Sequence, residues 1–352
     1  MKNRLKPALW AMMIGLLPIT AGSSPTGIAP AQAWGQGDSG FQTYLQGLRA
    51  KARAMGIRDS SFDAAIAGLT PNPRVVQLDQ GQPGGSFDSP IPPFEPYRQQ
   101  HLGASIIARG KTAYNTNRSQ LSAIERQTGV PESIMVAIFG HETSYGSYTG
   151  DFDLIRSLAT LAYEGRRRAL FEPELLATIK MLDNGVPRSR LVGSWAGATG
   201  YPQFLPSVYL RLARDGDGDG KADIWTSQAD ALASIANYFL QSGWRKGEPW
   251  GLAVNVPAGF NRSAVAAKLQ PARCPRVFNR HSRWLSMAEW RRLGMTAQGG
   301  WPGDHVMATL LEPDGPGKTA YLLTSNYRVI LDYNCSNFYA LSVGLLADAV
   351  EN

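Results

Sequence analysis

Hydrophobic and polar residues alternate with a helical period through much of the chain. Apolar residues recur every three to four positions in FQTYLQGLRAKARAMGI (41–57) and DSSFDAAIAGL (59–69), which predicts two helices near the start. The same period continues from about 101 to 250 in three segments, of which the second and third stop near a glycine, as helices commonly do. They are SQLSAIERQTGV (119–130), EPELLATIKMLDNG (172–185) and SQADALASIANYFLQSG (227–243).

One further predicted helix, PESIMVAIFGHETS (131–144), is apolar on every face. Pro131 and Glu132 are residues that favour the start of a helix. Residues 134–139 leave no polar side, which predicts a helix buried all round. Glu142 therefore stands at the end of a segment built for burial.

After Trp250 the pattern changes to short runs rich in β-branched and aromatic residues. Glycine, proline and aspartate separate these runs, which predicts a small antiparallel sheet. The runs are EPWGLAVNVP (248–257), HVMATLLEP (305–313), TAYLLTS (319–325) and YRVILDY (327–333). The last segment, SNFYALSVGLLADAVEN (336–352), returns to a helical period.

The stretch from Thr70 to Pro96 is rich in proline and glycine. It includes TPNPRVV and GQPGGSFDSPIPPFEP. Proline interrupts the interiors of helices and central strands, so this stretch is expected to be an extended connector that lies on another surface.

The N-terminus has the three-part layout of a secretory signal peptide. Lys2, Arg4 and Lys6 precede an uncharged apolar stretch that leads to Ala31-Gln32-Ala33, so cleavage is expected after Ala33. A membrane anchor is the alternative, but the stretch is broken by Pro18 and is shorter than the roughly 20 residues of a span. The mature protein is expected to be soluble and outside the cytoplasm, without a membrane anchor.

Charge and cysteine content narrow the function classes. Cleavage would lower the formal charge of +7 by three, and no basic block indicates nucleic acid. The mild positive charge suits a polyanionic partner such as a cell-wall polymer.

Cys274 and Cys335 allow one disulfide or two buried free thiols. The four histidines are scattered, which argues against a zinc site.

Glu142 is the first candidate for chemistry. Desolvation at the end of a buried helix would raise its pKa toward the range of a general acid. The small polar residues of TSYG (143–146) follow it and leave room for a polymer to approach. The alternative is a structural carboxylate held by hydrogen bonds.

The segment GSWAGATGYPQFLPSVY (193–209) is the second candidate. It combines glycines and Gln203 with the aromatic residues Trp195, Tyr201, Phe204 and Tyr209. Aromatic faces beside amide and hydroxyl groups suit a sugar-binding cleft, since sugars present C–H faces and hydroxyls. A packed loop is the alternative.

The third candidate, DGDGDGKADIWTSQAD (215–230), resembles the first half of an EF-hand calcium loop. Asp215, Asp217 and Asp219 occupy positions 1, 3 and 5, with Gly220 at position 6 and the Lys221 carbonyl at position 7. Position 12 is a threonine, so the closing ligand must come from Asp230 or Asp223. A simple Asp-Gly turn is the alternative, but three like charges without a cation would be costly. The calcium ion is expected to be structural.

These three motifs, in this order, resemble the soluble lytic murein transglycosylases related to membrane-bound lytic transglycosylase B. Further matching segments are LTPNPRVVQLDQGQP, SLATLAYEGRRR, ASIANYF and DYNCSNFYALSV, so the likeness covers nearly all of the mature chain.

The resemblance implies a mainly α, α+β fold. A lysozyme-like helical core would carry the EF-hand-like calcium loop, flanked by a helical domain from both chain ends and a small β domain. The implied parts are a signal peptide (1–33), N-terminal helices with a Pro-rich strap (34–110), the core (111–252) with its calcium loop (215–230), a β-rich domain (253–335) and a C-terminal helix that packs on the N-terminal part (336–352).

The resemblance also implies the reaction and its residues. Glu142 matches the single catalytic acid/base that cleaves the β-1,4 bond between N-acetylmuramic acid and N-acetylglucosamine without water and forms 1,6-anhydromuramic ends. The implied glycan-binding residues are Ser194, Gln203, Tyr238, Tyr333, Asn334 and Tyr339. The expected partners are peptidoglycan strands and cell-wall synthesis proteins. A lysozyme-type hydrolase, with Asp151 or Asp153 as second carboxylate, and a catalytically silent peptidoglycan-binding protein remain alternatives.

Overall fold

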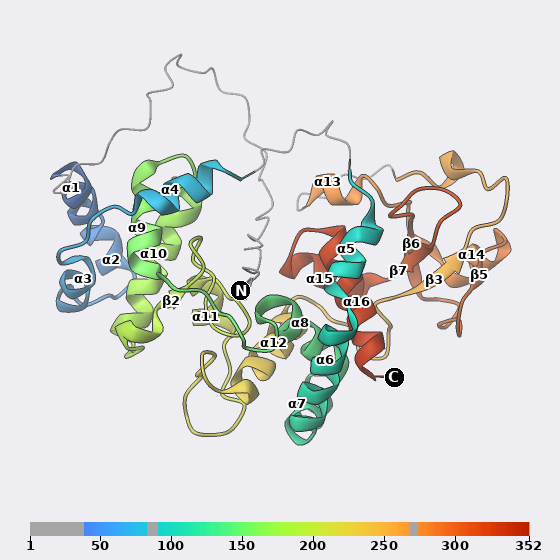
Figure 1. The fold of residues 1–352 in the computed structure, drawn as a ribbon, viewed down its shortest axis with the longest axis horizontal. Helices are drawn as coiled ribbons and strands as arrows, with labels where there is room; N and C mark the ends of the chain where they lie inside the picture. The colour runs from blue at the N-terminus through green and yellow to red at the C-terminus, as the bar shows by residue number, and fades with distance from the viewer. Residues whose placement is uncertain (1–38, 83–90, 268–273, 352) are drawn as a thin grey trace, which may run out of the picture.

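The computed structural model describes residues 39–82, 91–267 and 274–351, and they form a mainly helical protein with a five-stranded sheet and the two-stranded sheet β1-β2 (Figure 1). The helices are α1 (Ser39–Gly47), α2 (Arg49–Ala54), α3 (Asp59–Ile66), α4 (Pro73–Gln80), α5 (Phe94–His101), α6 (Ala104–Thr116), α7 (Arg118–Thr128), α8 (Glu132–Thr143), α9 (Leu154–Glu164), α10 (Arg168–Asp183), α11 (Pro206–Leu212), α12 (Gln228–Gln241), α13 (Pro275–Phe278), α14 (Met287–Arg292), α15 (Ser325–Tyr333) and α16 (Asn337–Glu351). The strands are β1 (Phe152–Asp153), β2 (Val192–Gly193), β3 (Gly251–Asn255), β4 (Leu285–Ser286), β5 (Thr296–Ala297), β6 (Met307–Leu311) and β7 (Ala320–Leu323).

Helix α8 lies at the centre of the main apolar cluster. Every residue from Glu132 to Gly140 is buried, which confirms the prediction of a helix enclosed on all sides. Helices α6, α7, α12 and α16 surround it, and α16 covers it most extensively. The end of α8 is therefore held in position by the packing of several helices.

The N-terminal helices share a second apolar cluster with α9 and α10. Phe41, Phe62 and Phe171 are fully buried in it. Helix α16 instead contacts α8, α5 and α6, on the other side of the molecule from α1 to α3 (Figure 1). Helix α16 thus packs on α5, which lies within the expected N-terminal part (34–110), whereas α1 to α3 share their core with α9 and α10.

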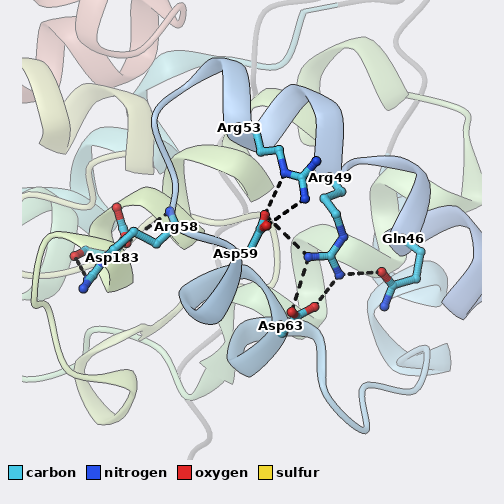
Figure 2. Close-up of polar contacts among 7 residues, drawn as sticks. All are labelled: Gln46, Arg49, Arg53, Arg58, Asp59, Asp63 and Asp183. Carbon is cyan, nitrogen blue, oxygen red and sulfur yellow. Dashed lines mark hydrogen bonds and ion pairs between the residues drawn. The ribbon is translucent and has the colours of Figure 1, made fainter.

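Ion pairs connect the first helices to each other and to α10. Figure 2 shows Arg49 and Arg53 of α2 beside Asp59 and Asp63 of α3, with Gln46 next to Arg49. Figure 2 also shows Arg58, which donates to the Asp183 carboxylate at 2.6 Å. Exposed pairs of this kind contribute about 0–1 kcal/mol each, so the apolar cluster beneath them supplies most of the docking free energy.

Part of the expected extended connector is helical. Residues 73–80 form α4, and the prediction of an extended chain is wrong there. The Asn72 side chain accepts a hydrogen bond from the Arg74 N–H, and Pro73 occupies the first turn, where its missing N–H costs nothing. Helix α4 then packs on α9.

The C-terminal sheet has five antiparallel strands in the order β4-β6-β7-β3-β5. Three of the four predicted runs form β3, β6 and β7, but YRVILDY forms helix α15, so its assignment as a strand is wrong. The Thr324 hydroxyl caps this helix by accepting from the Asn326 N–H. Tyr327, Ile330 and Leu331 then face the apolar cluster with helical spacing.

The signal peptide prediction lies outside the described residues. Among the residues that the structure describes, no helix is long and apolar enough to cross a membrane.

A disulfide joins Cys274 to Cys335, with a Cα–Cα distance of 5.7 Å. This settles the alternative between one bridge and two free thiols in favour of the bridge. It ties the segment before α13 to the segment between α15 and α16 across 61 residues of sequence.

Reducing this bridge is expected to lower the free energy of unfolding by about 2–5 kcal/mol, because a long loop loses its constraint in the unfolded chain. Thermal melting with and without dithiothreitol measures the effect. The double variant Cys274→Ser, Cys335→Ser serves as the control, since its melting must not respond to the reductant. Equal melting of the wild type under both conditions would contradict the prediction.

Candidate active site

Glu142 lies in the last turn of α8 and faces α16. The Tyr339 hydroxyl of α16 donates a hydrogen bond to Glu142 Oε1 at 2.6 Å. Burial raises the pKa of Glu142 to about 7, and the hydrogen bond from Tyr339 opposes this rise because it stabilises the carboxylate. Near neutral pH the carboxyl is therefore divided between its protonated and ionised forms, as a general acid/base requires.

Phenol side chains from three helices lie close to this carboxyl. Burial raises the pKa of Tyr97 in α5, Tyr333 in α15 and Tyr339 in α16, and the negative charge of Glu142 adds to all three shifts. Sequence reasoning missed Tyr97, because it stands directly after the proline-rich stretch and carries no motif of its own. These phenols remain neutral, and the Tyr339 hydroxyl donates to the carboxyl.

The neighbouring histidine is not a second ionised group. Burial lowers the pKa of His141 to about 4, so its ring is neutral at neutral pH. The ring lies 5.6 Å from the Tyr339 ring, measured between centroids. His141 therefore contributes shape to the site and no positive charge that would lower the pKa of Glu142.

Two aromatic residues of the 193–209 segment are core residues. Trp195 and Phe204 are only 4% and 3% exposed, so the expectation that their faces line a sugar cleft is wrong. Trp195 belongs to the N-terminal apolar cluster, and Phe204 packs on Tyr238 and Tyr333. The segment is closer to a packed loop in these places, and its polar groups remain available.

Ser194 and Gln203 have defined orientations in this loop. The Ser194 hydroxyl accepts from the Ala198 N–H at 2.9 Å, which leaves its own O–H as a donor. The Gln203 amide nitrogen donates to the Thr149 carbonyl at 3.1 Å and the Gly200 carbonyl at 2.9 Å. Both side chains are thus held by the backbone around them.

The end of α15 is fixed to this loop and to α12. The Tyr333 hydroxyl donates to the Pro202 carbonyl at 2.5 Å, and the Tyr238 hydroxyl donates to the Asp332 carbonyl at 2.7 Å. The Tyr238 and Tyr333 rings meet edge to face, 4.8 Å apart. The structure thereby brings Tyr238 and Tyr333 together with the loop that carries Gln203, and places Tyr333 near Glu142.

Asn334 follows directly after Tyr333. Its side-chain oxygen is enclosed and has no hydrogen-bond partner among the described residues. A buried acceptor without a partner is uncommon and calls for an explanation, such as a donor on a ligand.

Asp151 and Asp153 were the candidates for a second catalytic carboxylate. Asp153 caps α9 by accepting from the Arg156 N–H at 2.8 Å, and it pairs with Arg188 at 2.8 Å. Asp151 is exposed. Neither cause of the Glu142 pKa shift involves another carboxylate.

The acidic loop lies between α11 and α12 (Figure 1). Three carboxylates come together there. One oxygen from each of Asp215, Asp217 and Asp230 lies within 4.8 Å of the others. Asp230 is 1% exposed and accepts from the backbone N–H groups of Gly216 and Asp223, which fixes its direction. Hard carboxylate oxygens at this spacing fit a calcium ion.

The Asp219 carboxylate is not in this group, and the Lys221 carbonyl, a backbone group, stays a prediction. The Asp219 carboxylate accepts from the Lys221 N–H at 2.8 Å instead. The loop therefore offers three converging acidic ligands, one of them supplied by the first turn of α12.

Comparison with known proteins identifies the family of the chain. The family model "Transglycosylase SLT domain" matches residues 40–348. Membrane-bound lytic murein transglycosylase B of Escherichia coli (strain K12) is 32% identical over 257 residues, and the alignment covers 72% of this chain and 66% of that protein. The chain thus matches slightly less than two thirds of the length of that relative.

Solved structures show the same fold. SltB3 from Pseudomonas aeruginosa, in complex with NAG-anhNAM-pentapeptide, superposes with a TM-score of 0.79 at 39% identity, covering 89% of this chain and 80% of that chain. Escherichia coli lytic transglycosylase Slt35, in complex with calcium, superposes with a TM-score of 0.70 at 28% identity, covering 89% and 93%. On these matches of sequence and structure, the chain belongs to the transglycosylase SLT family.

Proposed function

We propose that this protein is a lytic transglycosylase that cleaves the β-1,4 bond between N-acetylmuramic acid and N-acetylglucosamine in peptidoglycan. Glu142 would act as the single acid/base, and the product would carry 1,6-anhydromuramic ends. The observation that carries the proposal is the Glu142 carboxyl, whose pKa burial raises to about 7 and which Tyr339 orients from α16.

The reaction needs one carboxyl in two successive roles. Protonated Glu142 gives its proton to the glycosidic oxygen as the C1–O bond breaks. The 2-acetamido oxygen of the muramic acid stabilises the positive charge that develops at C1. Ionised Glu142 then takes the proton from the C6 hydroxyl, whose oxygen forms the new bond to C1. No water is consumed, so the second carboxylate that most glycosidases use is not required.

The surrounding groups would hold the sugar for this sequence of steps. The enclosed Asn334 oxygen suits the N–H of the acetamido group, and the free O–H of Ser194 suits an oxygen of the same sugar. Gln203, Tyr238, Tyr333 and Tyr339 would line the glycan site. Such positioning removes several kcal/mol from a barrier.

The relatives support the substrate class. SltB3 was solved in complex with NAG-anhNAM-pentapeptide, a ligand with an anhydro sugar, and it is 39% identical to this chain. We extend that substrate class to this protein, together with a periplasmic location from the signal-like N-terminus and cell-wall synthesis proteins as partners.

For the acidic loop we propose a structural calcium ion. Asp215, Asp217 and Asp230 would hold it, and Slt35, 28% identical, was solved in complex with calcium. The ion would offset the repulsion among three carboxylates and connect the loop to the first turn of α12. Its expected effect is on stability.

Replacing Glu142 by Gln is expected to abolish release of anhydro-muropeptides from purified sacculi, because the amide cannot donate or accept the proton. Mass spectrometry of the soluble products measures this. Asp151→Asn is the matched control and is expected to keep the wild-type product pattern.

Each other outcome has a definite meaning. Reducing ends in place of anhydro ends would replace the proposal with the lysozyme-type hydrolase. Full lytic activity of Glu142→Gln would show that the acid is misassigned, and a wild type that binds sacculi without cleaving them would indicate a silent binding protein.

Replacing Tyr339 by Phe removes the hydrogen bond that stabilises the Glu142 carboxylate, so the pKa of Glu142 is expected to rise above about 7. The protonated acid then persists to higher pH. The alkaline limb of kcat/KM against pH should therefore move upward, and in Tyr238→Phe it should stay in place. An alkaline limb that moves downward would contradict this assignment.

Calcium at a hundredfold excess over its Kd is expected to stabilise the fold by about 3 kcal/mol through mass action. Thermal melting with added calcium and with a chelator measures the effect. Asp230→Asn should remove the response, and Asp219→Asn should keep most of it. Identical melting of the wild type with calcium and with chelator would rule out a bound ion.

A further inference from the structure

The turn after Glu142 holds two consecutive residues in a left-handed conformation. Ser144 has φ 50° and Tyr145 has φ 57°. A helix often ends on one left-handed residue, but that residue is usually glycine. Side chains other than glycine pay about 1–3 kcal/mol each in such regions, so the surrounding structure has to supply compensating contacts.

The Tyr145 ring is held in a slot made by two glycines. A Cβ atom at Gly140 of α8 would lie 2.5 Å from Tyr145 Cζ, and one at Gly110 of α6 would lie 2.5 Å from the Tyr145 hydroxyl oxygen. The hydroxyl is enclosed without a hydrogen-bond partner among the described residues. The ring is therefore retained by shape, between α6 and α8.

Arg109 of α6 contacts the same turn from outside. Its guanidinium donates to the Ser144 carbonyl and, at 2.5 Å, to Ser147 Oγ. Its Cζ atom lies 5.5 Å from the centroid of the Tyr145 ring. One cation thus binds the Ser144 carbonyl directly after α8 and lies over the ring of the next residue in the strained turn.

The turn also links Glu142 to the loop opposite. Thr143 Oγ1 donates to the Tyr201 carbonyl at 3.2 Å and accepts from the Gly146 N–H at 3.1 Å. Gly146 lies against the Tyr201 ring, since a Cβ there would be 2.9 Å from it. A shift of the turn would therefore move Glu142 relative to the 193–209 segment.

We propose that Arg109 is a positioning residue for Glu142: by holding the left-handed turn at Ser144 and Tyr145, it fixes the carboxyl relative to Tyr339 and the 193–209 segment. This inference rests on the proposed function. Arg109 itself needs no contact with the substrate or the reacting atoms.

Arg109→Gln tests the proposal, with Lys111→Gln as the matched control on an exposed position of the same helix. Both variants lose one positive charge. The rate of anhydro-muropeptide release should fall roughly 10- to 100-fold in kcat for Arg109→Gln, with KM changed less than about twofold, because a misplaced acid slows the chemical step more than binding. Lys111→Gln should match the wild type.

A second substitution separates positioning from general stability. Glycine adopts the left-handed conformation without strain, so Ser144→Gly should restore much of the lost kcat in the Arg109→Gln background. Arg109→Lys should retain an intermediate kcat, since an ammonium reaches one acceptor but does not reproduce the planar fork. A fall in kcat that Ser144→Gly leaves unchanged would overturn the proposal, as would wild-type kcat in Arg109→Gln.

Hydrogen exchange of the Ser144 and Tyr145 amides provides a readout without substrate. These amides should exchange faster in Arg109→Gln than in the wild type and the Lys111→Gln control. Unchanged exchange would refute the role of Arg109 in the turn. A wild type that releases no anhydro product would instead refute the proposed function, and the exchange result would still stand by itself.

Discussion

The hydrogen bond between Tyr339 and Glu142 is the contact on which the site depends. It joins the last helix of the described chain to the end of the central helix, across 197 residues of sequence. Helix α16 packs along α8, so the same surface that buries apolar side chains also encloses the carboxyl. Burial and orientation of the acid are therefore consequences of one helix pairing.

Two opposing effects set the pKa of this carboxyl. Desolvation favours the protonated form, and the Tyr339 hydroxyl favours the ionised form. Their balance near 7 suits a group that must give a proton and then take one back at the same pH. The neighbouring His141 is neutral because it is buried, so it does not disturb this balance. The surrounding phenols donate hydrogen bonds without adding charge.

The sequence predicted the elements whose pattern is local. The apolar run around Ile138 was sufficient for α8 and for the position of Glu142, and the Asp-Gly spacing was sufficient for the acidic loop. The proline content of 70–96 concealed α4, whose start uses Asn72 and Pro73 as a cap. The β-branched pair Val329 and Ile330 concealed α15, because tertiary packing outweighs that propensity.

Other features depend on distant contacts that no local pattern carries. Trp195 and Phe204 are core residues because the surrounding helices cover them. Tyr97 of α5 lies near the carboxyl, Arg109 of α6 contacts the turn after it, and neither has a motif. The most direct test of the account is a titration of the Glu142 carboxyl by carbon-13 NMR, in protein whose glutamate residues carry the label. The Glu142 signal is assigned as the one missing from Glu142→Gln. We expect a pKa near 7, and a value at or below the ordinary 4.5 would contradict the account.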